Sequence, residues 1–416
     1  MDSGFISNKD ILSTLINLPQ LVFEVTDACN LQCRYCGFGD LYTGYDDRRG
    51  NSLDFSIAKS IIDYLATIWE SYPTKFHTPH THISFYGGEP LMNMSFIKET
   101  VCYVESLKLS RHFAFSMTTN AMLLHRYMDY LVEKDFHLLI SLDGDKEGNR
   151  LRLQKNGDSS FDTVFTNVKL LQQKYPSFFQ TNVNFNTVLH CQNSIESVLG
   201  FFHKEFEKQP SISELNDSGI REEKREVFEK TYRSKKASLL DSRNPHQLSE
   251  SLFISDPDVK NLLLYLYQYS GNVFKDYNDL LANTKYRKFF PTGTCIPFSR
   301  KMFITVNGKI LPCEKVDHCF FYGTINQDGV HLDYEKVATE FNTYLERTMK
   351  KCSQCFRKTS CSQCLYYFDD IHSSCISHCR DYLDKEGFRH YKSVCLKYLD
   401  AHPYLYKQLM EKVIVD

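Results

Sequence analysis

The sequence predicts an α/β protein whose first half forms a partial (β/α)6 TIM-like barrel. Apolar runs typical of strands alternate with helical patterns between residues 20 and 215. The candidate strands are Leu21–Val25, Ile83–Tyr86, Phe113–Met117, His137–Leu142, Val183–Val188 and Ser211–Leu215. Alternating β/α units predict a parallel sheet, open or curled into an incomplete barrel, that binds ligands at the carboxyl ends of its strands.

The segments between these strands carry helical periodicity. In residues 161–171 the apolar side chains recur every three or four positions, which predicts an amphipathic helix. Asp54 precedes a second such segment, in which Ile57, Ile61, Leu65 and Ile68 lie on one face. We expect Asp54 to cap that helix, because its carboxylate can accept from the first free backbone N–H groups.

The composition is that of a globular protein without a strongly charged partner. Its 49 basic and 51 acidic residues give a net charge of −2, which argues against binding nucleic acid mainly through phosphates. No run of about 18 apolar residues indicates a membrane span, and the N-terminus lacks the pattern of a secretory signal. We therefore expect a cytoplasmic location, with no nucleic-acid or membrane partner.

Shifts in composition divide the chain into four predicted parts. The barrel occupies residues 1–215, and a charge-rich helical linker or insertion follows over residues 216–290. A solvated linker and a substrate-contacting insertion are both open for this second part. Residues 291–395 form a cysteine-rich region, and residues 396–416 form a C-terminal helix with an interruption at Pro403.

The chain contains fifteen cysteines, and in a cytoplasmic protein clustered cysteines usually bind metal, because disulfides are rare there. Cys29, Cys33 and Cys36 follow the first strand with spacings of three and two residues. Three thiolates in one loop can hold three corners of a 4Fe–4S cube and leave one iron open to a small molecule. Zinc is the alternative, but a structural zinc site needs four protein ligands.

This motif, with Tyr35 before its last cysteine, resembles the cluster-binding motif of the radical S-adenosylmethionine (SAM) enzymes. The segment Tyr86-Gly87-Gly88-Glu89-Pro90 after the second strand resembles the GGEP motif of the same family. By this resemblance, the backbone and the glutamate of the motif hold the amino group of the methionine part of SAM. Glycine suits the place because its backbone can approach a ligand closely.

Further polar residues resemble SAM contacts of the family, in the same order along the chain. They are Ser116, Thr118 and Asn120 at the ribose-contacting strand end, Ser141 and Asp143 in an SLDG segment, and Arg152 at the place of the arginine that pairs with the SAM carboxylate. The usual glycine after Asn120 is Ala121 here. Ordinary capping of strand ends is the alternative role for all these residues.

The C-terminal cysteines resemble those of a SPASM domain. Cys295, Gly308 and Cys313 match its opening, and Cys352, Cys355, Cys361 and Cys364 match its distinctive run, with two residues instead of the usual three between the last two. The resemblance implies two auxiliary 4Fe–4S clusters, which brings the expected total to three clusters and one SAM. Two CxxC pairs that bind one zinc are the alternative.

The resemblance also implies a ligand set for each auxiliary cluster. Cys295, Cys313 and Cys364 would bind the first, with Cys319 or a non-protein ligand as the fourth. Cys352, Cys355 and Cys361 would bind the second, which Cys379, Cys375 or Cys395 would complete, with Cys379 preferred. Cys102 and Cys191 have no partners in the sequence, so we expect them to be buried as small apolar residues.

Glu314 directly follows Cys313. In the related anaerobic sulfatase maturases an aspartate at the matching place is a candidate base, so Glu314 is a candidate catalytic residue here. The alternative, which the sequence favours, is a surface carboxylate on a hairpin.

The resemblance implies reductive cleavage of SAM to a 5′-deoxyadenosyl radical and hydrogen abstraction from a ribosomally made peptide, with a thioether from cysteine as the expected product. Formylglycine generation by a sulfatase maturase is the first rival, and a non-catalytic zinc scaffold is the second. A flavodoxin or ferredoxin is the expected electron donor. Only 28 residues precede Cys29, so recognition of a leader peptide would require a separate protein or another surface.

Overall fold

The computed structural model describes residues 5–74, 79–269 and 292–411, arranged in two compact units. The first unit comprises Asn8–Ser234 and Ile296–Val337. The second comprises Met1–Ser7, Lys235–Cys295 and Ala338–Asp416. Within the described ranges, no helix has the length and apolar character that a bilayer span requires.

The first unit is built on one ten-stranded sheet with the order β10-β9-β8-β7-β1-β2-β3-β4-β5-β6. Six strands are parallel neighbours in chain order: β1 Gln20–Thr26, β2 His80–Gly87, β3 His112–Thr119, β4 His137–Ser141, β5 Val183–Leu189 and β6 Ser211–Glu214. Each coincides with a predicted strand. The α/β class and the parallel sheet of a partial barrel are therefore confirmed.

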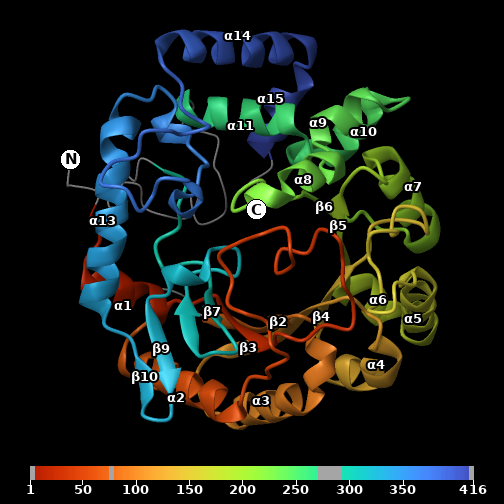
Figure 1. Ribbon diagram of the computed structural model, residues 1–416, viewed down its shortest axis with the longest axis vertical. Helices are drawn as coiled ribbons and strands as arrows, with labels where there is room; N and C mark the ends of the chain where they lie inside the picture. The colour runs from red at the N-terminus through yellow and green to blue at the C-terminus, as the bar shows by residue number, and fades with distance from the viewer. Residues whose placement is uncertain (1–4, 75–78, 270–291, 412–416) are drawn as a thin grey trace. The chain divides into compact units, whose positions relative to one another are not determined.

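Helices from the intervening segments cover the outer face of this sheet (Figure 1). They are α2 Phe55–Ser71, α3 Met94–Ser106, α4 Leu124–Glu133, α5 Phe161–Lys174, α6 Pro176–Asn182 and α7 Ile195–Phe206, with α1 Asn8–Ile16 before the sheet and α8 Arg225–Thr231 after it. The predicted helices around residues 57–68 and 161–171 are confirmed as α2 and α5. The carboxylate of Asp54 accepts from the backbone N–H of Ser56 at 2.8 Å, which confirms the predicted cap.

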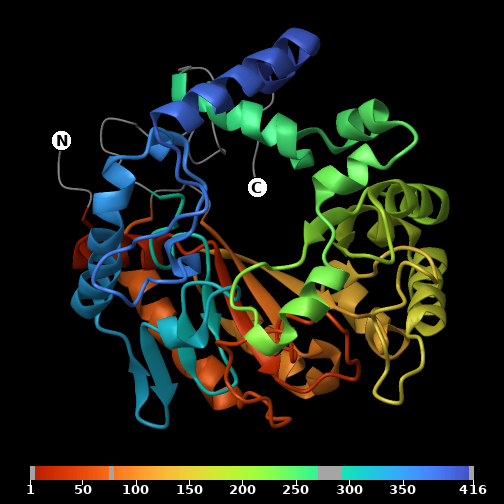
Figure 2. The same cartoon turned by 45° about the horizontal axis from the view of Figure 1, so that its top comes forward.

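Four short strands extend the sheet beyond β1. They are β7 Met302–Ile304, β8 Lys309–Leu311, β9 Gly323–Asn326 and β10 Gly329–His331. β7 pairs parallel to β1, with Leu21 opposite Met302, and the other three continue as antiparallel neighbours. The segment that follows Cys295 therefore lies directly beside the first strand of the barrel, and Figure 2 shows the strands of the sheet from a second direction.

The second unit is helical. Its helices are α9 Lys235–Leu240, α10 Pro245–Leu252, α11 Pro257–Tyr269, α14 Lys385–Ala401 and α15 Tyr404–Glu411, together with most of α13 Tyr334–Ser353. Apolar side chains of α11, α14 and α15 share one core, which contains Leu262, Cys395 and Leu405. The chain breaks between α14 and α15 before Pro403, as predicted, but the last helical region begins at Lys385 rather than at residue 396.

The predicted linker, residues 216–290, is only partly described. Up to Tyr269 it forms α8 to α11, and α11 contributes buried side chains to the helical core. Its remaining residues lie outside the described ranges. The described part is thus not a purely solvated linker.

Candidate functional site

The three cysteines Cys29, Cys33 and Cys36, here called the cysteine triad, lie in the loop after β1. Gln32 and Arg34 in this loop donate backbone hydrogen bonds of 2.7 and 3.0 Å to carbonyl oxygens in the 151–153 segment. These bonds join the loop after β1 to the segment that follows β4. Both segments lie beyond the carboxyl ends of their strands, where ligands bind in parallel α/β sheets.

The environment of the triad suits a cationic iron–sulfur group. Burial raises the pKa of Cys29 to about 11 and that of Cys33 to about 12. The thiol of Cys36 adds to both shifts, and that of Cys29 adds to the shift of Cys33. Buried thiolates that repel one another need a compensating positive charge, which a metal cluster supplies on binding. The chemistry of the residues present therefore fits a cluster.

In the described parts of the chain, no three His, Cys, Asp or Glu side chains are placed to hold one metal ion. A zinc site requires all of its sulfur ligands at about 2.3 Å from one ion. Zinc stays the alternative prediction for the cysteines.

Glu89 is buried and holds two loops together. Its carboxylate accepts from the Thr119 hydroxyl at 2.6 Å and from the backbone N–H groups of Leu91 and Asn120 at 3.1 and 2.7 Å. Burial raises its pKa to about 7. A carboxylate has about four acceptor positions, so the chain itself occupies most of them, and one remains for the predicted contact with the SAM amino group.

Gly87 and Gly88 are required by the packing of the loops after β1 and β2. A Cβ atom at Gly87 would overlap the carbonyl oxygen of Thr26, and one at Gly88 that of Ala28. Gly87 also has a φ of 134°, in the region that favours glycine. Pro90, the last residue of the motif, is buried at the start of a short 3-10 helix. The motif therefore has an architectural role besides the predicted approach to a ligand.

Asn120 contacts the cysteine loop. Its amide nitrogen lies 3.7 Å from the sulfur of Cys29 and donates to the Asn30 side chain at 2.8 Å. Ala121 follows with a φ of 60°, so an alanine adopts the left-handed conformation at the place where the family motif has glycine. In this structure the side chain of Asn120 therefore contacts the loop that carries the triad.

Asp143 lies at the centre of a buried network. Its fully buried carboxylate is paired with the Arg152 guanidinium, at 2.9 and 3.3 Å, and accepts from the Tyr35 hydroxyl and from the backbone N–H of Val188 at 2.9 Å. The Nε2 atom of His190 lies 3.6 Å away. Burial opposes the charge on Asp143, but Arg152 and His190 outweigh it, and its pKa lies below the usual value.

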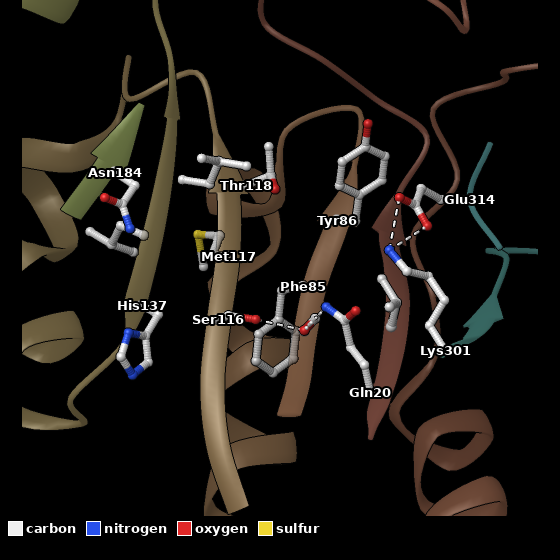
Figure 3. Close-up of a pocket in the computed structure, with 14 residues that line it drawn as sticks. Gln20, Phe85, Tyr86, Ser116, Met117, Thr118, His137, Asn184, Lys301 and Glu314 are labelled. Atoms are coloured by element: carbon white, nitrogen blue, oxygen red, sulfur yellow. Dashed lines mark hydrogen bonds and ion pairs between the residues drawn. The ribbon is translucent and has the colours of Figure 1, made fainter. Parts of the chain in front are cut away.

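A cavity of about 300 Å³ opens on the inner face of the sheet, and Figure 3 shows its lining. The Ser116 hydroxyl lies 2.6 Å from that of Ser84, which accepts from Gln20 at 2.8 Å. Thr118 also lines the cavity. Ser116 and Thr118 therefore face the barrel interior, whereas Ser141 ends β4, opposite Asn186 of β5.

Glu314 lines this cavity and is paired with Lys301, at 3.0 Å from both carboxylate oxygens. Its side chain is only 13% exposed. The expectation of a surface carboxylate is wrong, because β8 lies in the sheet beside β7 and delivers the residue to the interior. Burial raises the pKa of Glu314, but the Lys301 ammonium outweighs this and the pKa lies below its usual value.

Two tyrosines, Tyr86 and Tyr45, interact electrostatically with this carboxylate. Tyr86 extends into the cavity near Glu314 (Figure 3), and burial raises its pKa well above the usual value, with Glu314 and Cys36 adding to the shift. Burial likewise raises the pKa of Tyr45 to about 12, with smaller contributions from Cys36 and Cys313. Tyr45 therefore lies within electrostatic reach of both the triad and Cys313.

The second unit gathers four of the predicted auxiliary ligands. Burial raises the pKa of Cys352 to about 12, and the thiols of Cys361, Cys379 and Cys355 add to this shift. The two competing candidates lie elsewhere: Cys375 donates to a backbone carbonyl at 3.7 Å, and Cys395 is buried in the helical core. Among the three candidates, the structure thus places Cys379 with the others, and its role as a ligand stays a prediction.

The predicted ligands of the first auxiliary cluster belong to both units. Burial raises the pKa of Cys364 to about 11, and the nearby thiol of Cys295 adds to this shift. In the first unit the electrostatic neighbours of Cys313 are Glu314 and Lys301, and those of Cys319 are Asp317 and Lys309. The assembly of this ligand set stays a prediction.

Cys102 and Cys191 are exposed, so the expectation that they are buried is wrong. Cys102 lies on the outer side of α3, whose inner face is formed by other positions, among them the buried Val101 and Val104. Cys191 lies in the turn after β5.

The sequence profile of the radical SAM superfamily matches residues 23–203, which contain the triad, the glycine motif and the Asp143 network. These residues form a radical SAM domain. Members of this superfamily use SAM and a 4Fe–4S cluster, and the residues described above provide the fitting donors.

Three curated relatives share this domain. The chain is 28% identical over 187 residues to an uncharacterized protein of Methanocaldococcus jannaschii and 27% identical over 210 residues to a cysteine-type anaerobic sulfatase-maturating enzyme of Clostridium novyi. It is 23% identical over 181 residues to the radical SAM cyclopropyl synthase TigE of Paramaledivibacter caminithermalis. The matches cover 44%, 48% and 42% of this chain and 59%, 53% and 35% of the relatives.

Solved structures match over nearly the full length. Native anSMEcpe with bound AdoMet and Cp18Cys peptide has a TM-score of 0.60 at 18% identity, over 94% of this chain and 98% of that chain. A histidine-tagged form of anSMEcpe with bound AdoMet has a TM-score of 0.61, also at 18% identity, over 96% of both chains. At this identity the likeness shows the fold.

Three residues of the site carried no signal in the sequence. Lys301 precedes a strand that is not predicted to join the barrel, His190 is a single histidine after β5, and Tyr45 lies in an irregular loop. Each is positioned by contacts between segments far apart in the chain. The place of Tyr86 in the cavity could have been predicted, because alternation along β2 puts Tyr86 on the same face as Ser84.

The glycine motif gives a first prediction. Replacing Gly88 by alanine forces a Cβ into the backbone of Ala28, and we expect it to reduce the free energy of unfolding by about 3 kcal/mol, as in severe overpacking. The measurement is urea unfolding of the cluster-free protein. The matched control is Gly200→Ala in α7, where a Cβ meets no atom within 4 Å and stability should rise by about 0.5–1 kcal/mol. Equal effects of the two substitutions would contradict this account.

Proposed function

We propose that this radical SAM enzyme modifies a ribosomally made peptide at a cysteine residue. The observation that carries the proposal is the largely buried Glu314–Lys301 pair in the cavity, beside Cys313 and near Tyr86. A carboxylate placed next to a predicted auxiliary-cluster ligand is positioned to take a proton from a substrate. The likeness to anSMEcpe, which was solved with a bound Cp18Cys peptide, supports a peptide substrate.

We propose three 4Fe–4S clusters, one held by the triad and two by the C-terminal cysteines. When bound, SAM and its cluster would supply a 5′-deoxyadenosyl radical that removes a hydrogen atom from the substrate. The auxiliary clusters would accept the electron that the substrate radical then releases. We propose that SAM is bound by Gly87, Gly88, Glu89 and Pro90, together with Ser116, Thr118 and Ser141.

The contribution that we propose for Glu314 and Lys301 is the transfer of a proton from the substrate. The Lys301 ammonium keeps Glu314 ionised, and only the ionised carboxylate can accept a proton from a substrate thiol. The peptide thus loses one hydrogen atom, one proton and one electron, and a carbon–sulfur bond forms between cysteine and a second residue. This balance requires no further oxidant than one SAM and the auxiliary acceptor.

A thioether is the first candidate product. For the first auxiliary cluster we propose Cys295, Cys313 and Cys364 as ligands, with Cys319 or a non-protein group as the fourth. A position without a protein ligand could bind the thiolate of the substrate. Formylglycine generation is the second candidate, and the relative from Clostridium novyi and the full-length structural match favour it.

We further propose a flavodoxin- or ferredoxin-type electron donor, a cytoplasmic location, and recognition of a leader peptide by a separate protein or another surface. The chain spans about half the length of the curated relatives that it matches first, so these partners are inferred from the family alone.

Mass spectrometry after anaerobic turnover with SAM and reductant tests the proposal. One substrate is a cysteine-containing precursor peptide encoded beside the gene, and the other is a cysteine-type sulfatase peptide. We expect the precursor to lose two hydrogen atoms for each linkage, to keep every sulfur atom and to lose free thiols. Conversion of the sulfatase peptide to an aldehyde with loss of sulfur would assign the second candidate, and no change in either peptide would contradict both.

Replacing Glu314 by glutamine tests the proposed base. We expect the rate of peptide modification to fall by about 100-fold or more, in the range of lost acid–base catalysis, while release of 5′-deoxyadenosine continues. The control is Glu335→Gln, which changes an exposed carboxylate. Modification at the parent rate would restrict Glu314 to its ion pair with Lys301.

A further inference from the structure

Arg152 is held opposite Cys33 by the backbone. The hydrogen bonds from Gln32 and Arg34 to the 151–153 segment flank both residues. The Arg152 carbonyl oxygen also accepts from the fully buried Ser160 hydroxyl at 2.7 Å. The position of Arg152 relative to the triad is therefore set independently of its side chain.

The guanidinium group divides its donors between two partners. Nε and Nη2 donate to the two oxygens of Asp143, and Nη1 lies 3.9 Å from the sulfur of Cys33, within the range of a hydrogen bond to sulfur. The side chain of Arg152 is 9% exposed and that of Asp143 is fully buried. Asp143 thus occupies the Nε–Nη2 edge, and a carboxylate of SAM would have to use the Nη1–Nη2 edge, whose Nη1 is already directed at Cys33.

The carboxylate of Asp143 needs a cationic partner, so Arg152 cannot leave it unless another cation takes its place. Its other contacts are neutral donors, the Tyr35 hydroxyl and the Val188 N–H, and His190 at 3.6 Å. Withdrawal of the guanidinium would leave a buried charge without its cationic partner, which is strongly unfavourable. The pair therefore persists, and its third donor stays directed at the triad.

We propose that Arg152 and Asp143 are positioning residues for the cluster, which tune its reduction potential through Cys33, and that Arg152 does not provide the main contact to the SAM carboxylate. The inference rests on the proposed assignment of Cys33 as a cluster ligand. A cationic donor to a ligand sulfur stabilises the more negative, reduced form of a cluster, and nearby charge and hydrogen bonds set cluster potentials. Arg152 raises the potential, and Asp143, with the opposite charge, lowers it.

The first test is a redox titration of the reconstituted full-length protein without SAM, monitored by electron paramagnetic resonance. The second is anaerobic equilibrium dialysis, which measures the Kd for SAM. We expect Arg152→Gln to make the potential more negative and Asp143→Asn to make it less negative. The Kd for SAM should stay within about threefold of the parent value in Arg152→Gln. The matched control is Arg150→Gln, which changes an exposed arginine two residues away and should alter neither quantity.

An unchanged potential in Arg152→Gln would overturn the inference, and a SAM Kd raised by more than about tenfold in the same variant would assign Arg152 to the SAM carboxylate. If the glutamine variant does not retain a cluster, Arg152→Lys answers the question. Lysine keeps the charge but not the forked geometry, so we expect a shifted potential with unchanged SAM binding. A parent potential with weakened SAM binding in this variant would overturn the inference. Peptide turnover enters none of these readouts, so failure of the proposed function would leave the result interpretable.

Discussion

The buried carboxylate of Asp143 is the interaction on which the arrangement of the site depends. It joins the cysteine loop through Tyr35, the 149–154 segment through Arg152, and the end of β5 through Val188. Breaking a buried ion pair by removing one partner typically costs about 3–5 kcal/mol, a large part of the about 5–15 kcal/mol by which domains are stable. The loss of the contact with Arg152 would leave a buried charge unpaired. The network therefore stabilises the conformation of the cysteine loop.

The loops after β1, β2 and β3 add a second constraint. Gly88 allows the β2 loop to touch the backbone of Ala28, and Glu89 ties that loop to Thr119 and Asn120. Asn120 in turn reaches Cys29. The motif residues of the family thus form a scaffold around the triad before any ligand is considered, and the cavity with Glu314 and Lys301 opens beside it.

The sequence was sufficient for the features that depend on local pattern. The six parallel strands, the Asp54 cap and the break at Pro403 follow from periodicity and from single-residue chemistry, and the structure confirms them. Long-range pairing was beyond this reasoning. The parallel pairing of β7 with β1 joins Leu21 to Met302, and it brings Glu314 into the interior, against the expectation of an exposed hairpin.

The site residues show the same division. Residue types and spacing identified the triad and the glycine motif, because their chemistry is local. The partners that Arg152 and Glu89 have within the chain depend on which loops meet, and the sequence did not predict them. The exposure of Cys102 was mispredicted because the prediction used its residue type alone. The helical period of the buried Ile97, Val101 and Val104 places Cys102 off the inner face.

Release of 5′-deoxyadenosine from SAM by the chemically reduced protein tests the central claim most directly. We expect the parent protein to release it. We expect Cys33→Ala, which removes one proposed ligand of the cluster, to release none although the variant remains folded. Release by Cys33→Ala at the parent rate would contradict the assignment of the triad as the cluster that cleaves SAM.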